Sequence, residues 1–162
     1  MGAVHPRVLG ILGRALSLEL TAVQQYMTQA SLLELWGDHD SAARFRRETV
    51  EELRHAETLA QRMLALGAAP AASQLRPVTL AADLGGLLRQ NLALEQDLIH
   101  LYAEAVRFTL LIGDQHSCDL FTALLDDEEH HLRQLRDWLA DRPRESGFSG
   151  NPDRDPHARA TF

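Results

Sequence analysis

Two Glu-x-x-His sequences are the most chemically suggestive feature of the chain. Glu52 precedes His55 by three residues, and Glu128 precedes His131 by the same interval. Residues three apart lie on one face of an α-helix, so each pair can direct a carboxylate and an imidazole at one point. Mixed carboxylate and imidazole ligands suit first-row metals such as iron, manganese and zinc. The spacing therefore predicts two metal-binding helix faces.

The two pairs are part of a longer internal repeat. A shift of 76 positions superimposes Glu52-x-x-His55 on Glu128-x-x-His131. The same shift aligns further residues: Glu19 with Glu95, Tyr26 with Tyr102, and Gly37-Asp38 with Gly113-Asp114. Any two leucine-rich helices would match at leucines, but not at glutamate, tyrosine and Gly-Asp in one register. We infer a duplicated helix pair.

The repeated glutamates lie on apolar helix faces. Glu19, for example, has Leu12, Leu16 and Tyr26 on the same stripe, which carries no lysine or arginine. An unpaired buried carboxylate costs several kcal/mol, so a cation must compensate it. Four carboxylates balance two divalent ions, and two neutral imidazoles complete the ligand set. The predicted dinuclear metal site consists of Glu19, Glu52, His55, Glu95, Glu128 and His131.

Four helices must position these residues. Apolar residues recur at intervals of three and four, never of two, so we expect an all-α fold without strands. The expected helices cover 6–36, 40–66, 82–112 and 115–140. The segment 68–80 contains Pro70 and Pro77 and is expected to be a long crossover, as in some four-helix bundles. We therefore expect an antiparallel four-helix bundle over 1–141 and an irregular tail over 142–162.

Composition excludes several other classes of protein. A chain of 162 residues with a net charge of −7 is expected to form one domain and not to bind nucleic acid. The single cysteine, Cys118, excludes an internal disulfide framework. No apolar run is long enough to span a membrane, and no cleavable signal sequence is recognisable. A cytoplasmic location is the resulting expectation.

The motifs resemble those of bacterioferritin over about residues 8–140. They are Glu19-Leu-Thr-Ala-Val-Gln-Gln-Tyr26, Leu35-Trp36-Gly37, Glu51-Glu52-Leu53-Arg54-His55-Ala56, Leu92-Ala93-Leu94-Glu95 and Asp127-Glu128-Glu129-His130-His131. The resemblance implies a ferritin-like shell of 24 subunits, each binding two iron ions, oxidising Fe(II) with O2 or H2O2, and storing ferric mineral.

The resemblance also implies a role for each site residue. Glu52 and Glu128 would bridge the two irons, and Glu19 and Glu95 would each bind one iron terminally. His55 and His131 would each give one nitrogen. Tyr26 would hydrogen-bond to a ligand carboxylate.

The chain departs from the bacterioferritin pattern at three places. The family's haem-ligand methionine is replaced by Leu53, so we predict that the homo-oligomer binds no haem. A histidine of the family's inner-surface iron site is replaced by Arg47. Residues 142–162 do not resemble the family's fifth helix, so the role of this segment stays open.

Two alternative functions are compatible with the same site. One is a ferritin-like di-metal protein without storage, which scavenges peroxide. The other is a haem-free subunit of a mixed shell, assembled with a methionine-bearing, haem-binding partner. Manganese in place of iron, the physiological oxidant and the reductant for iron release also stay open.

Tyr102 and the pair Glu51 and Arg54 lie close in sequence to predicted site residues, and we expect smaller roles for them. Tyr102, like Tyr26, is expected to be buried and to hydrogen-bond to a carboxylate, a paired redox role being the alternative. Glu51 is expected to pair with Arg54 on the helix surface, three residues away.

Overall fold

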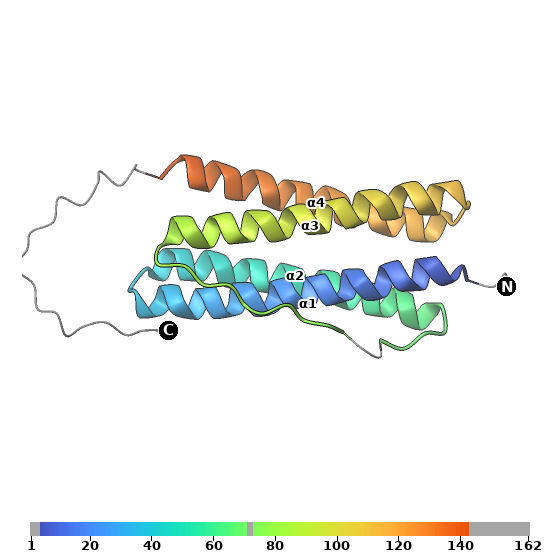
Figure 1. Ribbon diagram of the computed structural model, residues 1–162, viewed down its shortest axis with the longest axis horizontal. Helices are drawn as coiled ribbons and strands as arrows, with labels where there is room; N and C mark the ends of the chain where they lie inside the picture. The colour runs from blue at the N-terminus through green and yellow to red at the C-terminus, as the bar shows by residue number, and fades with distance from the viewer. Residues whose placement is uncertain (1–3, 71–72, 143–162) are drawn as a thin grey trace, which may run out of the picture.

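The chain folds into four long α-helices arranged as a bundle (Figure 1). The computed structural model describes residues 4–70 and 73–142, and these residues form no strand. The helices are α1 (Pro6–Leu35), α2 (His39–Ala65), α3 (Leu84–Leu111) and α4 (Gln115–Ala140). The predicted all-α four-helix bundle is confirmed, with every helix end within two residues of its expected position. The predicted tail lies, beyond Arg142, outside the described residues.

Matching signals end the first helix of each pair and start the second helix. Gly37 and Gly113 follow α1 and α3 with φ of 80° and 72°, a left-handed conformation that glycine adopts without a steric penalty. Asp38 and Asp114 then accept hydrogen bonds from the backbone N–H groups of Ser41 and Ser117, each at 3.1 Å. These N-caps satisfy a free N–H at the start of α2 and of α4. The repeat therefore extends to the turns.

The crossover sets the direction of the second helix pair. The segment between α2 and α3 runs the length of the bundle, so α3 starts at the opposite end from the end of α2 (Figure 1). The helices α1 and α3 are consequently antiparallel, with Tyr26 hydrogen-bonded to Glu95 and Tyr102 to Glu19. The four-helix topology thus brings the two copies of the repeat face to face.

Two apolar clusters enclose a polar layer in the middle of the bundle. One cluster includes Leu12, Leu59 and Phe121, and the other includes Leu33 and Phe45. All five of these residues are fully buried. The polar layer between the clusters is consequently shielded from water along the bundle axis.

Buried side-chain amides fasten the crossover to the bundle. Gln25 donates to Asn91 at 2.7 Å, and Asn91 donates to Gln29 at 2.8 Å. Gln29 donates to the carbonyl of Thr79, whose hydroxyl donates back to Gln25 at 2.9 Å. We call Gln25, Gln29, Asn91 and Thr79 the amide latch.

Among the described residues, no helix is long and apolar enough to cross a membrane.

Candidate metal centre

All six predicted site residues converge in the polar layer between the two apolar clusters. Glu19 comes from α1 and Glu95 from α3, while α2 and α4 each contribute one Glu-x-x-His pair. The four glutamates are fully buried, and His55 and His131 are 8% and 4% exposed. The apolar faces of the four helices meet in the core of the bundle. The charged groups on those faces therefore meet there too.

The six side chains form two overlapping sets of four. Glu19, Glu52, His55 and Glu128 make one set, and Glu52, Glu95, Glu128 and His131 make the other. Within each set, one oxygen or nitrogen per residue lies within 4.8 Å of those of the others. Because Glu52 and Glu128 belong to both sets, the arrangement offers two ion positions with two shared carboxylates.

The electron-donating atoms of this cluster fit a pair of metal ions. Both oxygens of Glu52 and of Glu128 are buried without a hydrogen-bond partner, as are Glu19 Oε2 and Glu95 Oε2. The Nδ1 atoms of His55 and His131 are also buried without one. Such atoms are costly to bury unless a ligand satisfies them. Carboxylate oxygens with one nitrogen per ion are a suitable donor set for a di-iron centre.

Each imidazole turns Nδ1 toward the shared carboxylates. His55 Nδ1 lies 2.9 Å from Glu128, and His131 Nδ1 lies 3.3 Å from both Glu52 and Glu128. The rings themselves are stacked, with centroids 5.8 Å apart. The two Nδ1 atoms are therefore the nitrogens available to a metal.

The opposite ring nitrogens contact acidic residues that we did not predict as part of the site. His131 Nε2 lies 2.9 Å from Glu51, and His55 Nε2 lies 3.4 Å from Asp127. The expected surface pair of Glu51 with Arg54 is thus wrong, because the Glu51 carboxylate is drawn to the imidazole across the bundle. Carboxylates on the outer nitrogen orient a metal-binding histidine and raise its basicity. The 76-residue shift that pairs Glu51 with Asp127 could have identified both.

Two buried tyrosines hold the outer carboxylates. Tyr26 donates its hydroxyl to Glu95 Oε1 at 2.5 Å, and Tyr102 donates to Glu19 Oε1 in the equivalent place. Both rings are fully buried. Each tyrosine occupies one carboxylate oxygen and leaves the other, Oε2, without a partner. Tyr102 was expected to be buried and hydrogen-bonded to a carboxylate, but only Tyr26 was predicted as a site residue.

Burial and neighbouring charges shift the pKa values of the residues in the centre. Burial raises the pKa of Glu19 and of Glu95 well above the usual carboxyl value. Burial disfavours the charged imidazole of His131, but the carboxylates of Glu128 and Glu52, each 3.3 Å from Nδ1, outweigh burial and raise the pKa to about 12. The pKa of His55 is raised for the same reason, and that of Glu128 is lowered by the two histidines despite burial. Metal ions must therefore displace protons.

The internal symmetry is broken on the side of α2 and α4. Glu48, Glu51 and His131 form a third group of potential ligands there. The residue that the repeat pairs with Glu48 is Leu124, so His55 has no such second carboxylate. Arg47 lies beside this group and lines the same surface pocket as Glu48 and Glu51. The two halves of the centre consequently differ in charge at their outer edge.

Leu53 lies away from the centre, on the surface of α2. Its side chain is 53% exposed, and Val50, one turn earlier, is 48% exposed. Both residues point outward from the face of α2 that carries Glu52 and His55, which are buried. Leu53 therefore lies on the outer surface of α2 and not among the ligands of the metal centre.

Comparisons with known proteins find similar sequences over most of the chain. Residues 9–144 match the ferritin-like domain family. The chain is 34% identical to bacterioferritin from Rhodobacter capsulatus, over 88% of this chain and 90% of that one. It is 35% identical to bacterioferritin from Brucella melitensis, over 83% and 84% respectively.

Two solved structures are similar over most of the chain. A bacterioferritin structure from Rhodobacter capsulatus, described with a metal-free dinuclear site and haem iron, superimposes with a TM-score of 0.82 at 33% identity. The bacterioferritin BfrA from Mycobacterium tuberculosis also superimposes with a TM-score of 0.82, at 29% identity. Each alignment covers 86% of this chain and 87% of the other.

Proposed function

This chain belongs to the bacterioferritins, within the ferritin-like family, and on that premise we propose that it is a ferroxidase that serves iron storage. It would bind two Fe(II) ions per subunit and oxidise them with O2 or H2O2. The observation that supports this most directly is the set of eight buried donor atoms without partners on six converging side chains. Burying these atoms without a ligand would destabilise the fold, so helix packing alone does not account for them.

We propose the following roles for the site residues. Glu52 and Glu128, shared by both ligand sets, would each bind both irons. Glu19 with His55 would complete one iron position, and Glu95 with His131 the other. Tyr26 would act by holding Glu95.

The charge of the centre suits a divalent substrate. Four carboxylates match the charge of two Fe(II) ions when the imidazoles are neutral. Each bound iron supplies one electron to the oxidant. The protein residues hold the two ions at one place, release protons as the ions enter, and exclude water through the surrounding apolar clusters.

Storage requires a closed shell, and we propose a shell of 24 subunits like that implied by the family resemblance. The exposed apolar pair Val50 and Leu53 on α2 supports burial against a neighbouring subunit. The expected cytoplasmic location stays a prediction.

The function can be tested with one variant and a matched control. In Glu128→Ala, both irons lose a shared ligand, so we expect the rapid phase of aerobic Fe(II) oxidation to disappear. Glu129→Ala removes an exposed carboxylate at the next position and should keep that phase. Oxygen consumption and absorbance would follow the reaction. Retention of the rapid phase in Glu128→Ala would contradict the role of this residue.

Native mass measurement before and after iron loading tests storage. A large closed assembly that gains mass with added iron supports a storage shell. A small oligomer with the same ferroxidase activity would instead support the alternative of a di-metal protein without storage. A chain that closes a shell only with a methionine-bearing partner would support the mixed assembly.

A further inference from the structure

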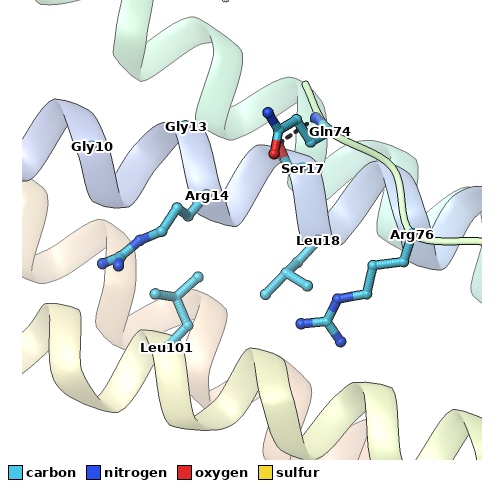
Figure 2. Close-up of a pocket in the computed structure, with 8 residues that line it drawn as sticks. All are labelled: Gly10, Gly13, Arg14, Ser17, Leu18, Gln74, Arg76 and Leu101. Carbon is cyan, nitrogen blue, oxygen red and sulfur yellow. Dashed lines mark hydrogen bonds between the residues drawn. The ribbon is translucent and has the colours of Figure 1, made fainter. Parts of the chain in front are cut away.

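The groove between α1 and α3 consists of two halves that the 76-residue repeat relates. In the covered half, the crossover lies against Gly86, Gln90 and Leu94 of α3, and Gln90 donates to the Leu80 carbonyl at 2.8 Å. The open half contains the residues 76 positions earlier. Gly10, Arg14 and Leu18 line a cavity of about 440 Å³ together with Leu101 of α3 and with Gln74 and Arg76 of the crossover (Figure 2). The open half is therefore the repeat equivalent of a surface that binds an extended segment of the chain.

The helical glycines support this reading. A Cβ atom on Gly86 would lie 2.5 Å from the Cβ atom of Ala81 in the crossover, so the close approach of the crossover requires glycine there. Gly10, its repeat equivalent, and Gly13 have no atom within 4 Å of the same position. Glycine inside a helix costs about 1 kcal/mol relative to alanine. Among the described residues, none accounts for these two glycines in α1.

The open half has its own chemistry. Figure 2 shows the guanidinium groups of Arg14 and Arg76 extending over the space between α1 and α3, with Leu18 and Leu101 between them. Arg76 is paired with Asp97 at 2.5 Å, while Arg14 has no ion pair within the described part of the chain. The repeat pairs Leu101, in the open half, with Gln25, in the covered half, so an apolar side chain replaces an amide there. This surface therefore suits a segment whose apolar side chains pack on Leu18 and Leu101 and whose carboxylate pairs with Arg14.

We propose that the C-terminal segment of the same chain, residues 143–162, docks in the open half of this groove. This inference is independent of the proposed ferroxidase function. The segment contains Asp153 and Asp155, and these carboxylates are the groups that we expect to pair with Arg14. Proline disfavours a helical backbone at the residue before it, and the segment contains Pro152 and Pro156 as the crossover contains Pro77.

The chain is long enough to reach the cavity. Arg142 lies beside Gly85 at the start of α3, since a Cβ atom on Gly85 would be 2.7 Å from its Nη1. Leu101 lies about 24 Å further along the helix, at 1.5 Å per residue. The eleven residues from Arg142 to Asp153 can span about 36 Å when extended. The carboxylates can therefore pass the centre of the cavity and reach Arg14.

Disulfide trapping in the full chain tests the proposal. In a Cys118→Ser background, Gly13→Cys lines the cavity and has room for a side chain, and His157→Cys supplies the second thiol. The control pair combines His157→Cys with Glu129→Cys, which is exposed on α4. We expect the cavity pair to form an intramolecular disulfide about tenfold faster than the control, because docking raises the local concentration.

A charge variant shows whether docking depends on the proposed contact. Arg14→Gln should slow the cavity pair by about threefold, as expected for loss of an exposed ion pair. The matched variant Arg47→Gln, on α2, should leave the rate unchanged. Equal rates for the cavity and control pairs would overturn the proposal. Rapid but intermolecular disulfides, seen as dimers on a non-reducing gel, would also overturn it and would assign the cavity to a second copy.

Discussion

At the scale of single residues, the two halves of the metal centre are built alike but can be disturbed separately. Tyr102 holds Glu19, and Tyr26 holds Glu95. Tyr102→Phe removes the donor that fixes Glu19 Oε1. We expect the ion position formed with Glu19 and His55 to lose about tenfold or more in affinity, as when other outer-shell partners are removed. Co(II) titration followed by visible absorption measures both positions without turnover.

The matching variant provides the control for this prediction. Tyr26→Phe should weaken the other position, formed with Glu95 and His131, and leave the first unchanged. Two Co(II) ions bound with wild-type affinities in both variants would show that the tyrosines only fill space.

The raised histidine pKa values predict how pH acts on the metal-free protein. A group with a raised pKa in the folded state stabilises the fold fully below its unfolded value, near 6.5 for histidine. That contribution is lost as pH rises toward the folded value, which is about 12 for His131. The melting temperature of the metal-free protein should therefore fall between about pH 6.5 and pH 9.

Metal binding should reverse that trend. Because the ions must displace protons from His55 and His131, Zn(II) affinity should increase with pH, and binding should release protons. Calorimetry in buffers of different ionisation enthalpy measures the release. Binding without proton release would show that the imidazoles are already neutral in the metal-free protein.

At the scale of helices and connections, the repeat made most of the site predictable. Helix periodicity placed Glu19, Glu52, Glu95 and Glu128 on apolar faces, and the Gly-Asp pairs located the turns. The sequence did not reveal the contact between His131 and Glu51, because this contact joins α4 to α2 across the bundle. Spacing along one helix favoured Arg54 instead. Contacts between helices depend on their relative rotation, which no single-helix pattern fixes.

The amide latch holds the crossover in place, and its loss should be costly. In Asn91→Leu, Gln25 loses its acceptor and Gln29 its donor, both inside the bundle. Unsatisfied buried groups cost about 1–3 kcal/mol each, so we expect the free energy of unfolding to fall by about 2–4 kcal/mol. Urea denaturation of the metal-free protein measures it. The exposed Gln134→Leu should change stability by less than about 0.5 kcal/mol.

At the scale of the whole molecule, assembly was the least predictable property. A single chain shows which faces are apolar, such as the surface around Val50 and Leu53, but not the angle at which copies meet. The similarity to the two bacterioferritin structures covers 86% of the chain, and the match to the ferritin-like family ends at residue 144. Residues 145–162 therefore lie outside the match to the family.

The final prediction concerns haem, which the structure from Rhodobacter capsulatus is described as containing. We expect the homo-oligomer of this chain to bind none, because leucine cannot ligate iron and the resemblance to bacterioferritin implies that Leu53 stands where the family has its haem-ligand methionine. Met63, on the same helix, is 7% exposed and lies about 15 Å away at helical rise, so it cannot substitute. Haem added to the purified protein should give a weak, unshifted Soret band. Leu53→Met should produce a stoichiometric low-spin spectrum if two copies meet across this face of α2. A low-spin haem spectrum from the unmodified protein would contradict the prediction and would identify another side chain as the ligand.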